Sequence, residues 1–268
     1  MTIFSLQLFR RYCLVFAGSL GLLIPSVILG LPVPVWSNEP AEPQNFLGWC
    51  QTKSSWPIAT QRTINYLLSA SSNDCVKAAQ QLEARTELLN SDPNFASTGI
   101  TDLRPLASLT KLQSINIISD ELTDLRPLAK MQNLAFLGIA RSNLTDLTPL
   151  IGLKKLRMLR LLYCKNITSL QPLSQIPQLN EILVWNSPVS DLSPLSQLPN
   201  LAEINLVGTQ VADLRPLAPL KSLRRLEIVG SKVQNLQGIA GLTGLQKVTL
   251  SENKIQDLRS IAKLTNLT

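Results

Sequence analysis

The chain has 268 residues, a formal net charge of +7 and no histidine. The lack of histidine excludes histidine-based acid–base catalysis, Ser-His-Asp triads and histidine metal sites. Basic and acidic residues are interspersed along the chain, which is typical of a solvated surface and does not indicate a nucleic-acid-binding face.

The first 37 residues have the pattern of an export signal. Arg10 and Arg11 precede an apolar run over residues 12–31, and Val35-Trp36-Ser37 offers a cleavage site after Ser37. The run is also long enough to remain as an uncleaved membrane anchor, since about 20 apolar residues span a bilayer. Either outcome predicts an exported body, in the periplasm, the cell envelope or outside the cell, with membrane contact only through this segment.

The next two segments differ from the rest of the chain. Residues 38–45 are polar and proline-rich, which predicts a linker. Residues 46–90 are predicted to form a helical N-terminal cap, with one helix starting at Trp56-Pro57 and a second following a turn that ends at Asp74. Such a cap would cover the open end of the repeats that follow.

Two of the four cysteines lie in the predicted cap. Cys50 and Cys75 are close in sequence within an exported chain, which favours a disulfide. The alternative is a pair of buried thiols. Cys164 lies alone among the repeats, and we expect it to be a structural free thiol.

A fixed repeat dominates residues 91–268. The string L-x-P-L places proline at 105, 127, 149, 172, 194 and 216, in steps of 22, 22, 23, 22 and 22 residues, and Gly238 and Ser260 continue the spacing. A period of this length indicates a solenoid. We predict about seven repeats and an incomplete last one, with the extra residue of the 23-residue step falling before Ile167.

Each unit ends in an x-L-x-L string, as in Leu159-Arg160-Leu161. This period of two predicts a short strand whose leucines point into the core. Stacked units would build one parallel sheet on the inner curve, with short helical or irregular turns on the outer curve. The predicted fold class is therefore an α/β solenoid with a small helical cap.

The units resemble the 22-residue leucine-rich repeats of bacterial internalin-like proteins. The resemblance is carried by Leu122-Thr123-Asp124-Leu125-Arg126-Pro127-Leu128-Ala129 and its copies, each followed by L-x-x-L-x-x-L-x-L, and covers about residues 86–268. It implies a curved, right-handed solenoid that binds a protein through its concave sheet. The chain departs from that pattern at the inner turn, where asparagine is mostly replaced by serine, threonine or cysteine.

Two polar columns recur with the repeat, and we expect structural roles for both. Aspartates three residues before the proline position should cap short helical turns, and we favour this role over a metal site; they are Asp102, Asp124, Asp146, Asp191, Asp213 and Asp257. Small residues three positions after the last strand leucine should satisfy backbone groups inside the stack; they are Asp120, Ser142, Cys164, Ser187, Thr209, Ser231 and Asn253.

The residues that alternate with the core leucines should face outward on the concave side. One column is apolar in six of seven places, and an exposed strip of this kind suggests a binding site; its members are Ile118, Ala140, Leu162, Trp185, Val207, Val229 and Ser251. The alternative is structural: a loop covers the strip, or strand propensity alone selects these residues. The candidate protein-binding residues are Phe136, Met158, Arg160, Leu162, Glu181, Leu183, Trp185, Glu203, Val207, Arg225 and Val229.

These patterns predict an exported, non-catalytic scaffold that binds an unidentified protein and uses no cofactor or metal. The alternative is a structural or self-assembling component of the cell envelope. It rests on residues 264–268, where the last unit stops before its strand and leaves an open C-terminal end for self-association.

Overall fold

The computed structural model describes residues 41–88 and 98–268. The chain divides into two units, Met1–Asn38 and Glu39–Thr268. The predicted export signal and the start of the predicted linker lie outside the described residues. Among the helices that are described, none is long and apolar enough to cross a membrane.

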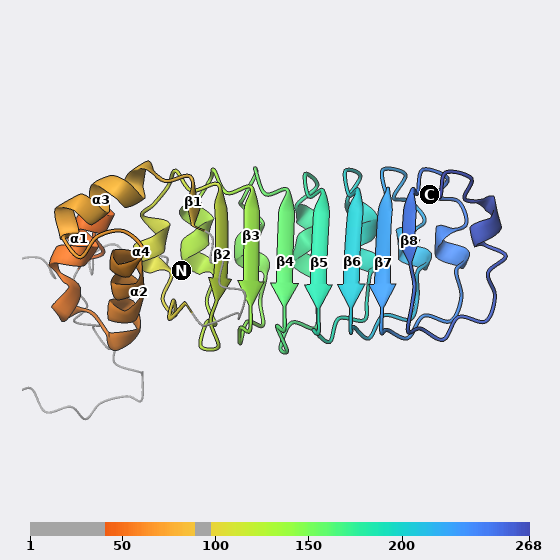
Figure 1. Ribbon diagram of the computed structural model, residues 1–268, viewed down its shortest axis with the longest axis horizontal. Helices are drawn as coiled ribbons and strands as arrows, with labels where there is room; N and C mark the ends of the chain where they lie inside the picture. The colour runs from red at the N-terminus through yellow and green to blue at the C-terminus, as the bar shows by residue number, and fades with distance from the viewer. Residues whose placement is uncertain (1–40, 89–97) are drawn as a thin grey trace, which may run out of the picture. The chain divides into compact units, whose positions relative to one another are not determined.

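Within residues 41–88 and 98–268, eight parallel strands form one sheet in chain order, each paired with the next (Figure 1). The register is constant, so that Ser114, Phe136 and Met158 lie side by side and begin successive strands. The strands are β1 Glu87–Leu88, β2 Ser114–Ile118, β3 Phe136–Ala140, β4 Met158–Leu162, β5 Glu181–Trp185, β6 Glu203–Val207, β7 Arg225–Val229 and β8 Lys247–Thr249. The strand in each predicted unit is found, and β1 is an addition that the repeat did not predict.

Short helices return the chain from each strand to the next on the other side of the sheet (Figure 1). Proline occupies one of their first two positions in the units that have it, where no backbone donor is needed. They are α4 Arg104–Ala107, η2 Arg126–Lys130, η3 Thr148–Leu150, η4 Gln171–Gln175, η5 Ser193–Gln197, η6 Arg215–Leu217, η7 Gln237–Ile239 and η8 Ile261–Lys263, all 3-10 turns except α4.

The core is a continuous stack of leucine, isoleucine and valine between the sheet and these helices. In the central repeats the inward side chains, such as Leu159, Ile182 and Leu206, are fully buried. Burying a side chain of this size stabilises the fold by about 1.5–3 kcal/mol. Because one repeat cannot bury its own leucines on both sides, the stack depends on its neighbours and on what covers its ends.

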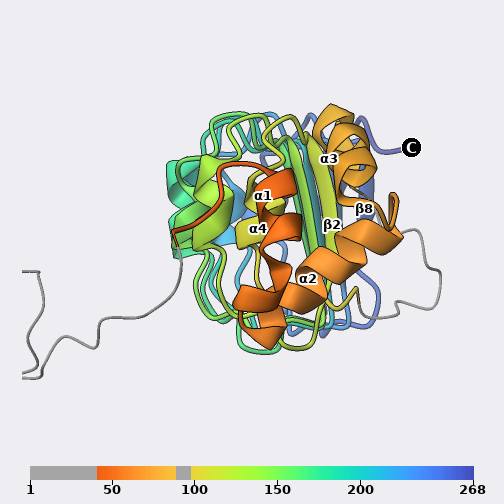
Figure 2. The same cartoon turned by 90° about the vertical axis from the view of Figure 1, so that its left-hand side faces the viewer.

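Three helices cover the N-terminal end of the stack, as Figure 2 shows from that side. The first is α1 Phe46–Gln51, which sequence analysis did not predict; a 3-10 turn, η1 Lys53–Ser55, follows it. The expected pair are α2 Ile58–Ser69 and α3 Cys75–Ala84. As expected, α3 follows a turn whose last residue, Asp74, caps it by accepting from the Lys77 N–H at 2.8 Å.

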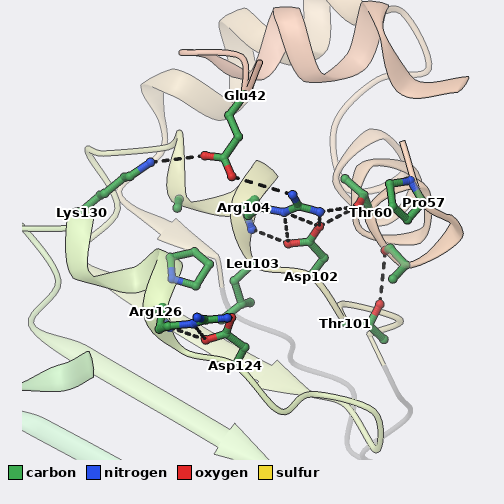
Figure 3. A pocket seen from close by; sticks show the side chains of 13 residues that line it. Glu42, Pro57, Thr60, Thr101, Asp102, Leu103, Arg104, Asp124, Arg126 and Lys130 are labelled. Atoms are coloured by element: carbon green, nitrogen blue, oxygen red, sulfur yellow. Dashed lines mark hydrogen bonds and ion pairs between the residues drawn. The ribbon is translucent and has the colours of Figure 1, made fainter. Parts of the chain in front are cut away.

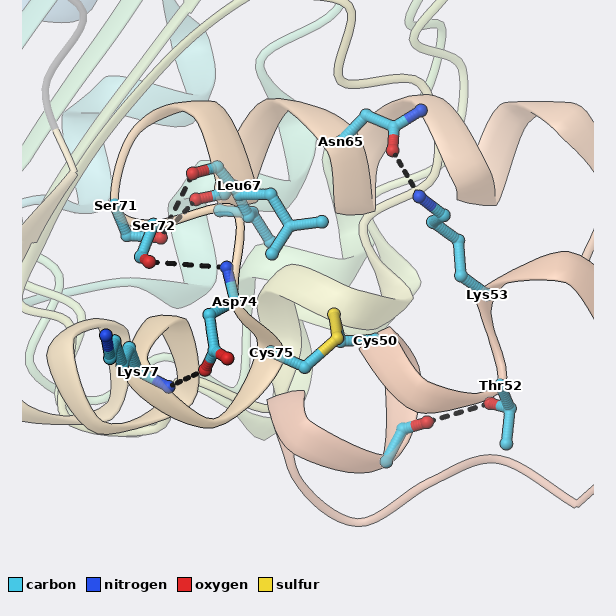
Figure 4. Close-up of a disulfide and its surroundings, with 12 residues drawn as sticks. Cys50, Thr52, Lys53, Asn65, Leu67, Ser71, Ser72, Asp74, Cys75 and Lys77 are labelled. Carbon is cyan, nitrogen blue, oxygen red and sulfur yellow. Dashed lines mark hydrogen bonds between the residues drawn. A yellow bond between two sulfur atoms is a disulfide. The ribbon is translucent and has the colours of Figure 1, made fainter.

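The disulfide between Cys50 and Cys75 joins the end of α1 to the start of α3 (Figure 4). The two Cα atoms are 5.7 Å apart, and the bridge spans 25 residues of sequence. The predicted pairing is therefore present in the structure. Of the described cysteines, Cys164 is free and buried, also as expected.

The aspartate column works differently from the expected helix cap. The N-cap residues of η2–η7 are leucines such as Leu125, that of η8 is Ser260, and no side chain caps these turns. Asp124 lies one residue earlier and accepts from the Arg126 N–H two positions ahead, at 2.9 Å. Asp146 and the later aspartates of the column make the same bond. The expectation that these aspartates cap the helices was therefore wrong. Each carboxylate closes the turn that leads into the helix.

The column of small residues is mostly buried, as a place inside the stack requires. Ser142, Cys164, Ser187, Thr209 and Ser231 are buried. Asp120, expected in the same column, is exposed and pairs with Arg141, while Ser119 is buried in that repeat. A carboxylate is too costly to bury without a partner, and here its partner is at the surface.

Candidate functional site

The outward face of β3–β7, which we call the open sheet face, carries the predicted binding residues. Constant register aligns them in three columns across the strands, as the alternation of side chains requires. Most of their side chains are half-buried by neighbours on the same face, and Arg225 is exposed. The structure brings together Phe136, Met158, Arg160, Leu162, Glu181, Leu183, Trp185, Glu203, Val207, Arg225 and Val229 on this face.

An apolar strip runs across the carboxyl ends of four strands. It consists of Leu162, Trp185, Val207 and Val229, which are direct neighbours in the register and half-buried. Ile118 and Ala140 continue the same column but are only 1% exposed. The strip is therefore shorter than the sequence suggested, because its first two members are already covered.

Trp185 is held in a fixed position within the strip. Its indole Nε1 donates to Asn205 Oδ1 on the next strand at 2.8 Å. A tryptophan anchored in this way loses little side-chain freedom on binding, and such residues dominate protein interfaces. Asn205 was not among the predicted residues. The sequence did indicate it, because the repeat places Asn205 in the column beside the strip, diagonally across from Trp185.

Charged groups occupy the amino-terminal half of the same face and pair across strands. Arg160 Nη2 lies 3.2 Å from Glu181 Oε1, and its guanidinium lies 5.3 Å from the Phe136 ring centroid. Further along, Arg225 Nη1 lies 3.3 Å from Glu203 Oε2. These pairs are partly exposed, so they add little stability and are better suited to orienting a partner.

A cavity of about 650 Å³ with several charged groups in its lining lies where the N-terminal helices meet the first repeats (Figure 3). Arg104 lies at its centre: its guanidinium bonds to Asp102, lies near Thr60, and packs 5.5 Å from the Trp56 ring centroid. Glu42, from the predicted linker, lies 3.8 Å from Arg104 and 3.5 Å from Lys130. We interpret this cavity as a structural junction, because its charged groups already pair with one another.

In the described part of the chain, no group of three or more His, Cys, Asp or Glu side chains could hold a metal ion. The turn aspartates lie in separate repeats, and four of them pair with the arginine two positions ahead. This Asp-x-Arg pairing is visible in the sequence as Asp-Leu-Arg. It gives each carboxylate a partner within its own turn.

The fold is similar to that of solved leucine-rich-repeat proteins. Internalin C2 of Listeria monocytogenes shares 26% identity and a TM-score of 0.66, over 77% of this chain and 90% of that one. The internalin inlF of the same species shares 27% identity and a TM-score of 0.53, over 78% and 73%. A leucine-rich-repeat protein of Leptospira interrogans, at 22% identity, a TM-score of 0.50, and 63% and 50% coverage, shares the fold alone. No protein-family model and no curated protein matches the chain.

Proposed function

We propose that this internalin-like leucine-rich-repeat protein is an exported, non-catalytic scaffold that binds a protein through its open sheet face. The observation that carries the proposal is the apolar strip beside a row of paired charges, on strands whose backbones are fixed by their neighbours. An apolar patch with an anchored tryptophan and a charged border is the arrangement typical of a protein interface.

Export is supported by two features. The disulfide between Cys50 and Cys75 requires an oxidising compartment to persist. The first 37 residues have the charge and apolar pattern of an export signal. A reduced cytoplasm would leave both cysteines as thiols.

The open sheet face also indicates the chemistry of the partner. Leu162 and Trp185 require an apolar surface on the partner, placed near the carboxyl ends of the strands. Glu181 lies to one side of Arg225 in the amino-terminal column, so the charge changes sign along the sheet. The complementary partner has an apolar ridge flanked by a basic and then an acidic region.

The proposal is tested by capture of partners with the full chain as bait. The variant Leu162→Lys with Trp185→Lys places two charges in the strip. Since truncating one interface anchor costs at least about 2 kcal/mol, we expect the enriched protein to be lost, with a fall in affinity of about 30-fold or more.

The matched control is Gln175→Lys with Gln197→Lys. These exposed residues lie on η4 and η5 and add the same charge to the other side of the sheet. Circular dichroism checks that both variants fold. If both folded variants and the parent enrich the same protein, the strip is structural and the proposal fails.

A second candidate function is end-to-end self-association. In the described chain β8 is paired on one side only. Beside it Leu258 is 62% exposed, next to a cavity of about 500 Å³ lined by Val248, Leu250 and Ile261. Sedimentation velocity over a hundredfold concentration range tests this candidate: association that Leu258→Lys abolishes supports it, and a monomer throughout rejects it.

A further inference from the structure

A second recess, which we call the strand-end pocket, lies beyond the carboxyl ends of β2–β4. Its volume is about 620 Å³. It is next to the apolar strip, because Tyr163 follows Leu162 directly and its N–H donates to the Trp185 carbonyl at 2.7 Å. The lining residues are Asp120, Arg141, Ser142, Asn143, Tyr163 and Lys165.

One wall of the pocket is a fixed polar network that joins two repeats. Arg141 Nε and Nη2 bond to the two carboxylate oxygens of Asp120 at 3.0 and 2.9 Å. Asn143 Nδ2 donates to the Asp120 carbonyl at 2.6 Å. The carboxylate, the guanidinium and the amide oxygen therefore present acceptors and donors in set directions.

Tyr163 supplies the apolar surface of the pocket. It is 43% exposed, and the other large exposed apolar side chains of the described residues, Ile58, Val76 and Leu258, lie in other parts of the fold. Every other residue that lines the pocket is polar or charged. A single aromatic face among polar groups suits a ligand that has both a flat apolar face and a polar edge.

The backbone holds two of these side chains in an unfavourable conformation. Arg141 and Tyr163 both have φ of 56°; in the later repeats the same position is Asn186 and Glu252, also at positive φ, and Gly208 and Gly230. A side chain in this left-handed region costs about 1–2 kcal/mol. Residues retained at such a cost are candidates for function.

The single irregular repeat adds a cation to the same place. The 23-residue step between Pro149 and Pro172 inserts its extra residue before Ile167, next to Lys165. Lys165 is exposed, and it forms no ion pair within the described residues. The insertion therefore coincides with a lysine that forms no ion pair among the described residues.

We propose that the strand-end pocket binds an acidic saccharide. A sugar ring has an apolar face of C–H groups, which stacks on the Tyr163 ring, and a rim of hydroxyls, which bonds to Asp120 and Asn143. A carboxylate on the ring, as in a uronic acid, pairs with the Lys165 ammonium. An acidic peptide fits less well, because the pocket offers it one apolar side chain and no unpaired strand edge for backbone hydrogen bonds.

Calorimetric titration of the full chain with trigalacturonic acid tests this proposal. Tyr163→Gly removes the ring and also relieves the backbone, so the fold is retained. We expect the affinity to fall about three- to tenfold, the value of one aromatic contact. Lys165→Gln should weaken trigalacturonic acid several-fold and leave binding of the neutral sugar maltotriose unchanged.

Asn186→Gly is the matched control, because Asn186 has the same left-handed backbone at φ of 49° in the next repeat and lies outside the pocket. It should leave the affinity unchanged. The proposal is overturned if trigalacturonic acid does not bind, or if Tyr163→Gly binds it as tightly as the parent. It is also overturned if maltotriose or citrate binds equally well, because ring and charge would then not act together.

Discussion

The inner-turn column holds one asparagine, near the end of the stack, and small side chains occupy the same column in most other repeats. Asn253 donates from one amide nitrogen to the carbonyls of Ile228, Leu250 and Ser251, at 2.7–3.1 Å. Thr209 and Ser231 instead share a hydrogen bond of 2.8 Å between their hydroxyls. Single hydroxyls satisfy fewer backbone groups, so neighbouring repeats are joined by side-chain pairs in place of a continuous asparagine ladder.

Cys164 belongs to this inner column, and its chemistry follows from burial. Burial raises the pKa of its thiol, while Ser142 Oγ donates to its sulfur at 3.2 Å. A protonated, enclosed thiol is a poor nucleophile. We therefore expect Cys164 in the native protein to react with a thiol reagent such as Ellman's reagent only as fast as the fold opens.

Substitution separates the packing of Cys164 from its reactivity. Cys164→Ser should change the free energy of unfolding in urea by no more than about 1 kcal/mol, because serine already occupies this column at Ser142 and Ser187. Cys164→Ala leaves the Ser142 hydroxyl without its acceptor and should cost about 1–3 kcal/mol. A rapid reaction of the native thiol would show that the repeat is open at this position.

The turns between strands and 3-10 helices depend on ionised aspartates. Hydrogen bonds from the residue two positions ahead lower the pKa of Asp124, Asp146, Asp191, Asp213 and Asp257. An ordinary aspartate in an unfolded chain has a pKa of about 3.9. Because the folded pKa is the lower one, these groups stabilise the fold above the unfolded value, and the contribution is lost as pH falls through the folded pKa.

We therefore expect the melting temperature to be level between about pH 5 and 7 and to fall below about pH 4. Replacing the five aspartates with asparagine should flatten the acid limb, because an amide oxygen closes the same turn without titrating. Asn235 already does this by accepting from the Gln237 N–H. An unchanged acid limb in the five-fold variant, measured by calorimetry, would place the acid sensitivity elsewhere.

The disulfide acts within the N-terminal helices alone. It links α1 to α3. Polar contacts from α2 to the first repeats are made by Thr60 with Asp102 and Arg104, by Thr63 with the Asp102 N–H, and by Arg62 with Glu121. Replacing Cys50 and Cys75 with serine should destabilise these helices by about 3 kcal/mol, the value expected for a loop of this length. Hydrogen exchange should accelerate over residues 46–84 and stay unchanged in β4–β6.

Cys164→Ser, with the disulfide intact, is the control for this experiment. If loss of the disulfide accelerates hydrogen exchange in β4–β6 as much as in residues 46–84, the helices and the repeats unfold together. In that case the junction at Arg104 couples them more strongly than its partly exposed ion pairs suggest.

The repeat predicted most of the fold, because each x-L-x-L string must turn its leucines to a shared core. The same logic aligned the predicted binding residues in their columns, and their role in binding remains a prediction. What the sequence could not show was local: the Asx turn of Asp124, the exposed Asp120, and the left-handed Tyr163. These depend on φ angles and on which neighbour fills a turn. Gly208 and Gly230 were the available signal for Tyr163, since glycine marks a column where φ is positive.

The two ends of the stack differ in how well they are covered, and this should set the order in which the molecule opens. At the N-terminal end Ile100 and Leu106 are fully buried beneath the helices. At the other end the inward residues Val248 and Leu250 are only partly buried, and β8 has one neighbour in the described chain. Because the stability of a solenoid is nearly a sum over neighbouring repeats, the less covered end should open first.

Hydrogen exchange read by mass spectrometry should therefore be fastest in β8 and slow progressively toward β5.

Asn253→Ala removes the three carbonyl contacts of the last turn, so it should accelerate exchange in residues 247–268 and leave β5 unchanged. Ser187→Ala, which removes the hydroxyl that accepts from the Cys164 N–H at 3.2 Å, is the control in the middle of the stack. Ser187→Ala should accelerate hydrogen exchange in the repeats on both sides of it, because a central repeat packs against two neighbouring repeats. Uniform exchange along the sheet, or acceleration of β5 by Asn253→Ala, would mean that the repeats open as one cooperative unit and that the open end does not control stability.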